Sequence, residues 1–284
     1  MNIVTPKGKV IIAGAGPGDP DLISVKAANY LQQADIVLTD RLVSKEIIAR
    51  YVSSSAMVIE VGKQCRRGVS TPQLTINELL VKYAQQGKLI VRLKGGDVAF
   101  YSNVFDELET LLLHKIPYEI VPGITAASGA SAYAGIPLTA RDHATAVRFL
   151  TYYKSTAVKD GYWKELAVTE DTLVFYMSSE TLDELVNKLI ENGMAADTQL
   201  AVVEQASTPF QQVYITAIQD YANTLKNQTF LSPSLVIIGK VVRLHESFNW
   251  FTGSNTKEYY FQPLTAQVET MVKNDTNKRH VSRA

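Results

Sequence analysis

The sequence of 284 residues has few of the residues that build disulfide frameworks and metal centres. It contains one cysteine, Cys65, and four histidines, which stand at positions 114, 143, 245 and 280. One cysteine excludes an internal disulfide and any metal site that needs several cysteines. The scattered histidines do not favour a histidine-based site either. We therefore expect no metal site built from cysteines or histidines.

An excess of charge of one sign and long apolar runs are also missing. The 28 basic and 28 acidic residues give a formal net charge of zero. A neutral protein has no general field that attracts nucleic acid or a membrane surface, so an acidic ligand needs a local group of Arg and Lys. No apolar stretch approaches the ~18 residues that span a bilayer, and the N-terminus has no apolar signal-peptide core. We expect a cytoplasmic protein without nucleic-acid or membrane partners.

Short apolar runs alternate with helical patterns in the first part of the chain. The expected strands are residues 10–13, 36–39, 57–61, 89–93 and 118–121. The expected helices between them are residues 21–33, 44–51, 71–86 and 103–114. Asp21 is the expected cap of the first helix. This alternation predicts an α/β domain over residues 1–122, built on a mostly parallel sheet.

A second α/β domain is expected over residues 123–246. A stretch of small residues, VPGITAASGASAYAGIP, begins it and predicts a turn, a tightly packed helix and a second turn. Small side chains suit either close approach of a flat ligand or plain helix–helix contact. The expected strands are residues 146–151, 172–176, 199–204, 211–216 and 234–239, and the expected helices are 182–192 and 217–223.

The third and fourth of these strands are close in sequence and predict a hairpin, so we expect this sheet to be mixed. From residue 247 onward the composition turns polar. Residues 247–284 are therefore expected to form an extension that is partly disordered.

A glycine-rich turn, GAGPGD at residues 14–19, follows the first expected strand. A dinucleotide-binding loop needs a third glycine where this chain has Asp19, and no Gly-Lys-Ser/Thr follows that would make a phosphate loop. An acid at the exit of the loop would also repel a pyrophosphate. The turn is therefore not expected to bind phosphate.

Two further glycine turns, RLKGGD at residues 92–97 and VPGIT at 121–125, also follow expected strands. In open α/β sheets the carboxyl edge binds ligands, so the three turns should converge there around a pocket. Its turns would offer the carboxylates of Asp19 and Asp97, which suit a zwitterionic or cationic ligand.

Six segments occur in an order that resembles a known family. They are GAGPGDPDLISVKA, LTDRLVS, VGK, RLKGGD, VPGITAASGASAYAGIPLT and LVFYM, within residues 8–242. Together they resemble the tetrapyrrole methylases, which are class III S-adenosylmethionine-dependent methyltransferases, and among them the uroporphyrinogen-III C-methyltransferases. The resemblance implies transfer of two methyl groups to C-2 and C-7 of uroporphyrinogen III, which gives precorrin-2 for siroheme or cobalamin biosynthesis. It also implies a homodimer, no metal, S-adenosylhomocysteine as product, and an active-site cleft between the two domains.

The resemblance also implies roles for individual residues. The cofactor contacts would be Pro17, Gly95, Gly96, Asp97, Phe100, Thr125, Ala126, Met177 and Ala206. The proton acceptor would be Asp40 and the proton donor Lys63, while Arg41, Arg141 and Met177 would contact the substrate. The residues alone leave alternatives open: Asp40 could cap a helix or pair with Arg41, and Lys63 could be a solvated surface charge.

A substrate with many carboxylates calls for a cationic rim in a neutral protein. The candidates are Arg41, Lys63, Arg66, Arg67, Lys94, Arg141 and Arg148. The adjacent pair Arg66 and Arg67 could equally form a solvated loop. Arginine suits this role because it holds a carboxylate through paired hydrogen bonds.

The chain departs from the family pattern after RLKGGD. The family continues PFVFGRGGEE, whereas this chain reads VAFYSNVFDE, so that Asn103 replaces an arginine with a proposed role in substrate binding or deprotonation. Asp40 or a neighbour is then the expected acceptor, and Ser102-Asn103 should begin a helix. Two other functions stay open: a later precorrin C-methyltransferase of cobalamin biosynthesis, and a tetrapyrrole-binding homologue that does not methylate. No dehydrogenase or ferrochelatase module precedes the matched region, so a monofunctional chain is expected.

Overall fold

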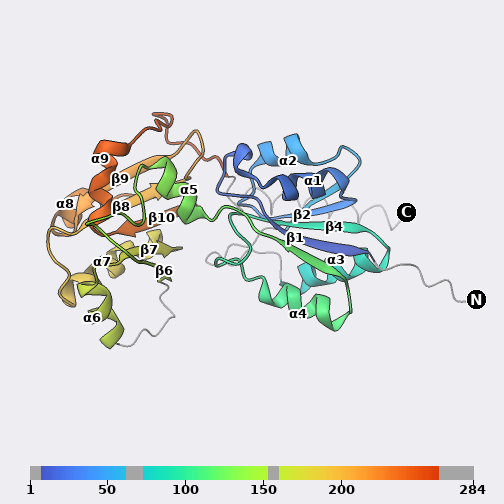
Figure 1. The fold of residues 1–284 in the computed structure, drawn as a ribbon, viewed down its shortest axis with the longest axis horizontal. Coiled ribbons are helices and arrows are strands. Elements are labelled where there is room, and N and C mark those ends of the chain that lie inside the picture. The colour runs from blue at the N-terminus through green and yellow to red at the C-terminus, as the bar shows by residue number, and fades with distance from the viewer. Residues whose placement is uncertain (1–7, 62–72, 153–159, 262–284) are drawn as a thin grey trace, which may run out of the picture. The chain divides into compact units, whose positions relative to one another are not determined.

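The structure is a computed structural model that describes residues 8–61, 73–152 and 160–261 (Figure 1). The chain divides into two compact units, the first comprising Met1–Ile124 and Phe261–Ala284 and the second comprising Thr125–Tyr260. The boundary between the two units therefore follows Ile124, whereas the sequence predicts a boundary after residue 122. None of the helices in the described ranges has both the length and the apolar character that a bilayer span needs.

The first unit is built on a five-stranded parallel sheet. Its strands are β1 Lys9–Gly14, β2 Ile36–Thr39, β3 Met57–Glu60, β4 Leu89–Lys94 and β5 Tyr118–Val121. Their order is β3-β2-β4-β1-β5, and every neighbouring pair is parallel. This confirms the predicted parallel sheet, and all five strands lie where the apolar runs predict them.

Helices cover both faces of this sheet, as a parallel sheet requires. The helices are α1 Val25–Gln33, α2 Lys45–Tyr51, α3 Gln73–Gln85 and α4 Phe105–Leu113. Along β1, Val10 and Ile12 join the core under α3 and α4, while Ile11 and Ala13 join the core under α1 and α2. Figure 1 shows α1 and α2 on one side of the strands and α3 and α4 on the other.

Two helix starts differ from the sequence prediction. Residues 20–22 form a separate 3-10 turn, and α1 begins only after Ser24, whose hydroxyl accepts a hydrogen bond from the Ala27 nitrogen at 3.3 Å. The expected cap Asp21 is therefore wrong. Helix α4 begins after Val104 without a side-chain cap, while Asn103 Nδ2 donates to Asp106 Oδ2 at 3.0 Å.

The second unit is built on a mixed five-stranded sheet. Its strands are β6 Val147–Thr151, β7 Thr172–Tyr176, β8 Gln199–Glu204, β9 Gln212–Ala217 and β10 Ser234–Ile238. Their order is β6-β7-β10-β8-β9, with β6 and β7 parallel and the other neighbours antiparallel. The predicted mixed sheet and the β8–β9 hairpin are both confirmed.

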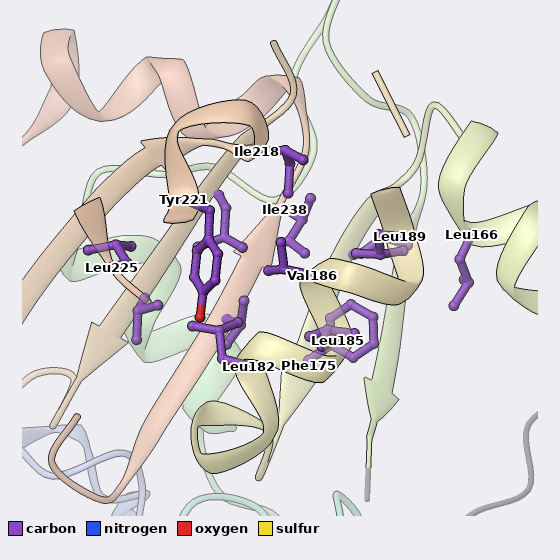
Figure 2. Close-up of a cluster of buried hydrophobic side chains, with 14 of the residues drawn as sticks. Leu166, Phe175, Leu182, Leu185, Val186, Leu189, Ile218, Tyr221, Leu225 and Ile238 are labelled. Atoms are coloured by element: carbon purple, nitrogen blue, oxygen red, sulfur yellow. The ribbon is translucent and has the colours of Figure 1, made fainter. Parts of the chain in front are cut away.

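The helices of this unit pack on both faces of its sheet. They are α5 Ala126–Tyr133, α6 Asp160–Val168, α7 Leu182–Glu191, α8 Tyr221–Thr224 and α9 His245–Phe248. Figure 2 shows the core on one face, where Phe175 of β7 lies among Leu185, Val186 and Leu189 of α7. The small-residue helix α5 packs on the other face through Ala127 and Ala130. The sequence predictions did not include α6 and α9.

The structure describes the polar extension as far as Phe261. Trp250 Nε1 donates to the Ala132 carbonyl at 2.8 Å. The Phe251 ring lies 4.9 Å from the Tyr133 ring, measured between centroids, in an edge arrangement. The beginning of the extension therefore packs against the end of α5.

Candidate active site

Two of the three glycine turns are hydrogen-bonded to each other at the carboxyl edge of the first sheet. The Gly16 nitrogen donates to the Gly96 carbonyl at 3.1 Å, and the Gly96 nitrogen donates to the Gly16 carbonyl at 2.8 Å. The Ala15 nitrogen donates to the Lys94 carbonyl at 2.8 Å. These bonds form because β1 and β4 are parallel neighbours whose ends meet at one edge.

The third turn reaches the same place through backbone contact. A Cβ atom added at Gly14 would lie 2.6 Å from the Gly96 oxygen and 2.7 Å from the Gly123 Cα. A Cβ added at Gly123 would lie 2.3 Å from the Gly96 oxygen. Only glycine fits at these positions, because any side chain would meet backbone. The predicted convergence of the three turns is confirmed.

Asp97 holds two of these turns together. Its side chain is 7% exposed, and its two oxygens accept hydrogen bonds from the nitrogens of Ala99 and Gly123, each at 2.8 Å. Each carboxylate oxygen has a second lone pair that can accept from a ligand. Pro17 is buried beside Gly16, whereas Phe100 lies exposed just beyond Asp97.

The other predicted carboxylate, Asp19, has a local role. Its Oδ1 accepts from the Asp21 nitrogen at 2.8 Å and caps the 3-10 turn at residues 20–22. Of the two carboxylates expected from the turns, Asp97 therefore lies at the meeting point of the glycine turns, while Asp19 stabilises the turn that leads into α1.

Asp40 follows β2 and belongs to a row of four charged side chains that alternate in sign, namely Asp40, Arg92, Glu107 and Lys94. Arg92 Nη2 donates to Asp40 Oδ1. Arg92 Nε donates to Glu107 Oε1 at 3.1 Å, and Lys94 Nζ donates to both oxygens of Glu107 at 3.1 Å. Arg92, Lys94 and Glu107 are fully buried, while Asp40 is 24% exposed.

These ion pairs decide between the structural alternatives for Asp40, which were a helix cap and a pair with Arg41. The cap of α2 is Ser44, and the ion pair that Asp40 makes in the described structure is with Arg92. A pair with Arg41 is therefore not what holds it. Arg41 is partly buried, and burial lowers the pKa of its guanidinium, which stays charged at neutral pH.

Burial and neighbouring charges shift the pKa values of Lys94 and Arg92. Burial lowers the pKa of Lys94, and the positive charge of Arg92 lowers it further, against the opposing effect of Glu107. Burial also acts to lower the pKa of Arg92, but the carboxylates of Asp40 and Glu107 outweigh it and raise that pKa. Lys94 is enclosed and ion-paired, so its expected place in a cationic rim is wrong.

Arg148 is also wrong as a rim residue. Its Nε donates to Asp171 Oδ2 at 2.6 Å, and its Nη1 pairs with Glu165. Both partners belong to the second unit, so this arginine joins β6 to the neighbouring α6 and to the residue before β7. The remaining candidates Lys63, Arg66 and Arg67 lie outside the described residues.

A second set of predicted residues gathers in the second unit around Tyr176. The Tyr176 hydroxyl is 2.7 Å from Thr125 Oγ1 and accepts a hydrogen bond from the Ala127 nitrogen at 3.2 Å. Ala206 and Ala126 pack in the same apolar cluster as Tyr176. Tyr176 therefore fixes the beginning of α5 against the end of β7.

The ends of β7 and β8 lie at one edge of their sheet, because both strands run antiparallel to β10 between them. Leu235 of β10 is the partner of Tyr176 on one side and of Val203 on the other. Met177, directly after β7, has φ of 55° and is 49% exposed. Left-handed backbone at a non-glycine residue is uncommon and is found at sites of function. Met177 is thus an exposed residue directly after Tyr176, whose hydroxyl holds the start of α5.

Arg141 occupies a tight turn in the second unit. The Ala140 nitrogen donates to the Ala144 carbonyl at 3.0 Å, and Asp142 has φ of 66°. The Arg141 side chain is exposed. The structure therefore places Thr125, Ala126, Met177 and Ala206 together in the second unit, with Arg141 on an exposed turn. Lys63 is outside the described residues.

Three residues of the candidate site were not among the predictions. Arg92 binds Asp40, Glu107 holds Arg92, and Tyr176 joins β7 to α5. A signal for the first pair exists in the sequence, because Arg92 and Lys94 alternate in a strand that is otherwise apolar. Two such charges in a buried strand call for a buried acid, which is Glu107.

Comparison with known proteins identifies the family. The family model of the tetrapyrrole (corrin/porphyrin) methylases matches residues 9–222. The chain belongs to the tetrapyrrole methylases. Its two sheets, one parallel and one mixed, match solved structures of this family.

Two solved tetrapyrrole methylases share the fold over most of the chain. Uroporphyrin-III C-methyltransferase from Thermus thermophilus, complexed with S-adenosylhomocysteine, is 31% identical with a TM-score of 0.70, covering 84% of this chain and 100% of that one. A cobalt precorrin-4 methyltransferase of cobalamin biosynthesis is 29% identical with a TM-score of 0.73, covering 82% of this chain and 95% of that one.

Siroheme synthases are more similar in sequence. The siroheme synthase of Vesicomyosocius okutanii is 45% identical over 244 residues, which cover 86% of this chain and 52% of that protein. The siroheme synthase of Stutzerimonas stutzeri is 46% identical over 253 residues, which cover 88% and 54%. The chain thus spans about half the length of these relatives.

Proposed function

We propose that the chain is a uroporphyrinogen-III C-methyltransferase that moves two methyl groups from S-adenosyl-L-methionine to C-2 and C-7 of uroporphyrinogen III. The product is precorrin-2, the precursor of siroheme and cobalamin. The observation that carries the proposal is the convergence of the three glycine turns on Asp97, in a chain 31% identical to the Thermus thermophilus uroporphyrin-III methyltransferase. The identity to siroheme synthases, at 45%, supports the same substrate.

The residues present fit the methyl donor. In the first unit the proposed contacts are the half-buried Gly95 and Gly96 and the carboxylate of Asp97, together with Pro17 and Phe100. In the second unit the proposed contacts are Thr125, Ala126, Met177 and Ala206. A ligand with an ammonium and ribose hydroxyls is suited to the free lone pairs of Asp97, and the apolar groups suit its other surfaces. When bound, S-adenosylmethionine supplies an electrophilic methyl group on a sulfonium.

The remaining roles concern the substrate and its protons. Asp40, a partly exposed carboxylate at the end of β2, is the proposed acceptor of the proton that the ring loses after methylation, and Lys63 is the proposed donor. Arg41 and Arg141 are proposed to bind substrate carboxylates through paired hydrogen bonds, and Met177 to line the same surface. Much of the rate would come from holding the reacting atoms in line.

A later precorrin C-methyltransferase is the second candidate. The TM-score of 0.73 with a cobalt precorrin-4 methyltransferase favours it. So does Asn103, which replaces the expected arginine and bonds to Asp106. This candidate ranks second because the chain is 45% identical to a siroheme synthase and 29% identical to the cobalt precorrin-4 methyltransferase. The third, a tetrapyrrole-binding homologue without methylation, would keep the cofactor residues and lose turnover.

The test is methyl transfer by the purified chain, with S-adenosylmethionine and uroporphyrinogen III generated without oxygen. Methylated product from uroporphyrinogen III supports the proposal, and product only from an already methylated precorrin supports the second candidate. Cofactor binding with no product from either would support the third. The homodimer, the cytoplasmic location, and the absence of metal, nucleic-acid and membrane partners stay predictions.

A further inference from the structure

The guanidinium of Arg92 is fixed from three directions. Its Nε donates to Glu107 of α4 at 3.1 Å, and its Nη1 donates to the carbonyls of Leu38 at 3.3 Å and Leu93 at 3.2 Å. Only 2% of the side chain is exposed. With a helix, the neighbouring strand and its own strand all holding it, the group has no freedom to follow a mobile partner.

The remaining nitrogen, Nη2, points to Asp40 and binds Oδ1 of its carboxylate. The backbone of Asp40 is held as well, because its nitrogen donates to the Leu93 carbonyl at 3.2 Å and its carbonyl accepts from Val43 at 3.1 Å. A carboxylate fixed at its backbone and at one oxygen has a set plane. The direction of its second oxygen, Oδ2, is therefore determined.

The four charged side chains of this row have a net charge of zero. Lys94 and Arg92 supply two positive charges, and Glu107 and Asp40 supply two negative ones. A buried arginine needs a neutralising partner, and Glu107 provides it inside the unit. The contact with Asp40 connects this buried group to a partly exposed residue at the carboxyl edge of the sheet, where the three glycine turns meet.

We propose that Arg92, held by Glu107, is a positioning residue that aims the Asp40 carboxylate at the substrate. This inference rests on the proposed function, in which Asp40 accepts the proton from the methylated ring. Arg92 touches neither substrate nor cofactor in this account. Its effect on catalysis passes through Asp40, since misplacing a reacting group by about 1 Å costs ~100-fold in rate.

The test is a double-mutant cycle on Asp40→Asn and Arg92→Lys, with kcat and KM measured for methyl transfer to uroporphyrinogen III. Lysine keeps the charge and loses the fork that reaches both carboxylates. We expect Arg92→Lys to lower kcat ~10- to 100-fold, with KM for S-adenosylmethionine changed less than ~2-fold. In the Asp40→Asn background the same substitution should lower kcat no further, because the group that it positions is already lost.

A second variant keeps the inference testable if Arg92→Lys does not fold. Glu107→Gln keeps the shape and loses the charge that holds Arg92 Nε, and it should lower kcat several-fold in the wild-type background and not in Asp40→Asn. The control is Arg243→Lys, an exposed arginine that pairs with Asp197 and has no role in the proposed function, and this variant should keep kcat unchanged. Thermal unfolding and S-adenosylhomocysteine binding by calorimetry report the fold and the cofactor site of each variant.

The outcomes separate this inference from the proposed function. If both arginine and glutamate variants lose the same factor in the wild-type and Asp40→Asn backgrounds, the positioning role is wrong and the methyltransferase stands. If Asp40→Asn keeps full kcat, the inference fails in the same way, since there is no acceptor to position. If the wild type methylates no uroporphyrinogen III, the proposed function fails and the inference falls with it.

Discussion

The carboxylate of Asp97 joins the second glycine turn to the third, since Oδ2 accepts a hydrogen bond from the backbone nitrogen of Gly123 at 2.8 Å. Gly123 is followed by Ile124, the last residue of the first unit before Thr125. One buried side chain thus fixes the backbone where the chain leaves the first unit.

Asp97→Asn should destabilise the protein by ~1–3 kcal/mol, because its amide nitrogen would face one of two backbone N–H donors that need an acceptor. Urea unfolding followed by circular dichroism measures this. Asp106→Asn is the control, since Asp106 bonds only to the Asn103 side chain through its carboxylate in the described structure. Equal stability of the two variants would contradict the role of Asp97 as a tether.

Gly14→Ala should lower the free energy of unfolding by ~1–3 kcal/mol, because its Cβ would lie 2.7 Å from Gly123 Cα and neither backbone can move freely. Gly161→Ala is the opposite case, since nothing lies within 4 Å of its Cβ in helix α6. That change should stabilise by up to ~1 kcal/mol. The two melting temperatures should therefore move in opposite directions, and a parallel shift would count against the backbone contact.

Tyr176→Phe removes the hydroxyl that binds Thr125 Oγ1 and the Ala127 nitrogen. We expect a loss of ~1 kcal/mol in stability. We also expect weaker binding of S-adenosylhomocysteine in calorimetry, because the start of α5 is no longer held. Tyr162→Phe, at an exposed tyrosine of α6, is the control. Unchanged affinity in Tyr176→Phe would mean that the start of α5 does not contribute to the cofactor site.

Glu119 predicts a pH dependence of stability. Hydrogen bonds from Lys26, then Lys9 and Tyr30, lower the pKa of Glu119 from 4.5 to about 2. Because the folded-state pKa lies below the unfolded-state value, the stabilisation is complete above about pH 4.5 and is lost as the pH falls toward about 2. The difference in melting temperature between wild type and Glu119→Gln should be constant above this window and shrink within it.

The control for Glu119 is Glu109→Gln, an exposed glutamate of α4 for which the described structure shows no ion pair. The difference in melting temperature between Glu109→Gln and wild type should not shrink as the pH falls from about 4.5 to about 2. Salt at ~1 M should reduce the Glu119 effect, because these charges are partly exposed. A difference that grows as the pH falls would have the wrong sign and would contradict the ion pairs.

The strands could be predicted from the sequence because each is a short apolar run that ends at a turn residue. The convergence of the glycine turns followed from one rule, that parallel strands end at the same edge of a sheet. The helix starts were harder, since Asp21 and Ser24 are both good caps and only the hydrogen bond to Ala27 distinguishes them.

The partners of the site residues could not be predicted, because they depend on long-range packing. Arg92 lies 52 residues from Asp40 in sequence, and Tyr176 lies 51 residues from Thr125. The neighbour in sequence, Arg41, was the natural partner for Asp40 on local grounds alone. The register of β2 against β4, which pairs Leu38 with Arg92, is what brings the distant arginine to it.

The most direct test of the central claim is the mass of the product formed from uroporphyrinogen III and S-adenosylmethionine under anaerobic conditions. We predict a net gain of two CH2 units, because each of two ring carbons gains a methyl group and the ring loses one proton for each transfer, with two molecules of S-adenosylhomocysteine released for each tetrapyrrole consumed. Unmodified uroporphyrinogen III, recovered from protein that still binds S-adenosylhomocysteine, would contradict the claim.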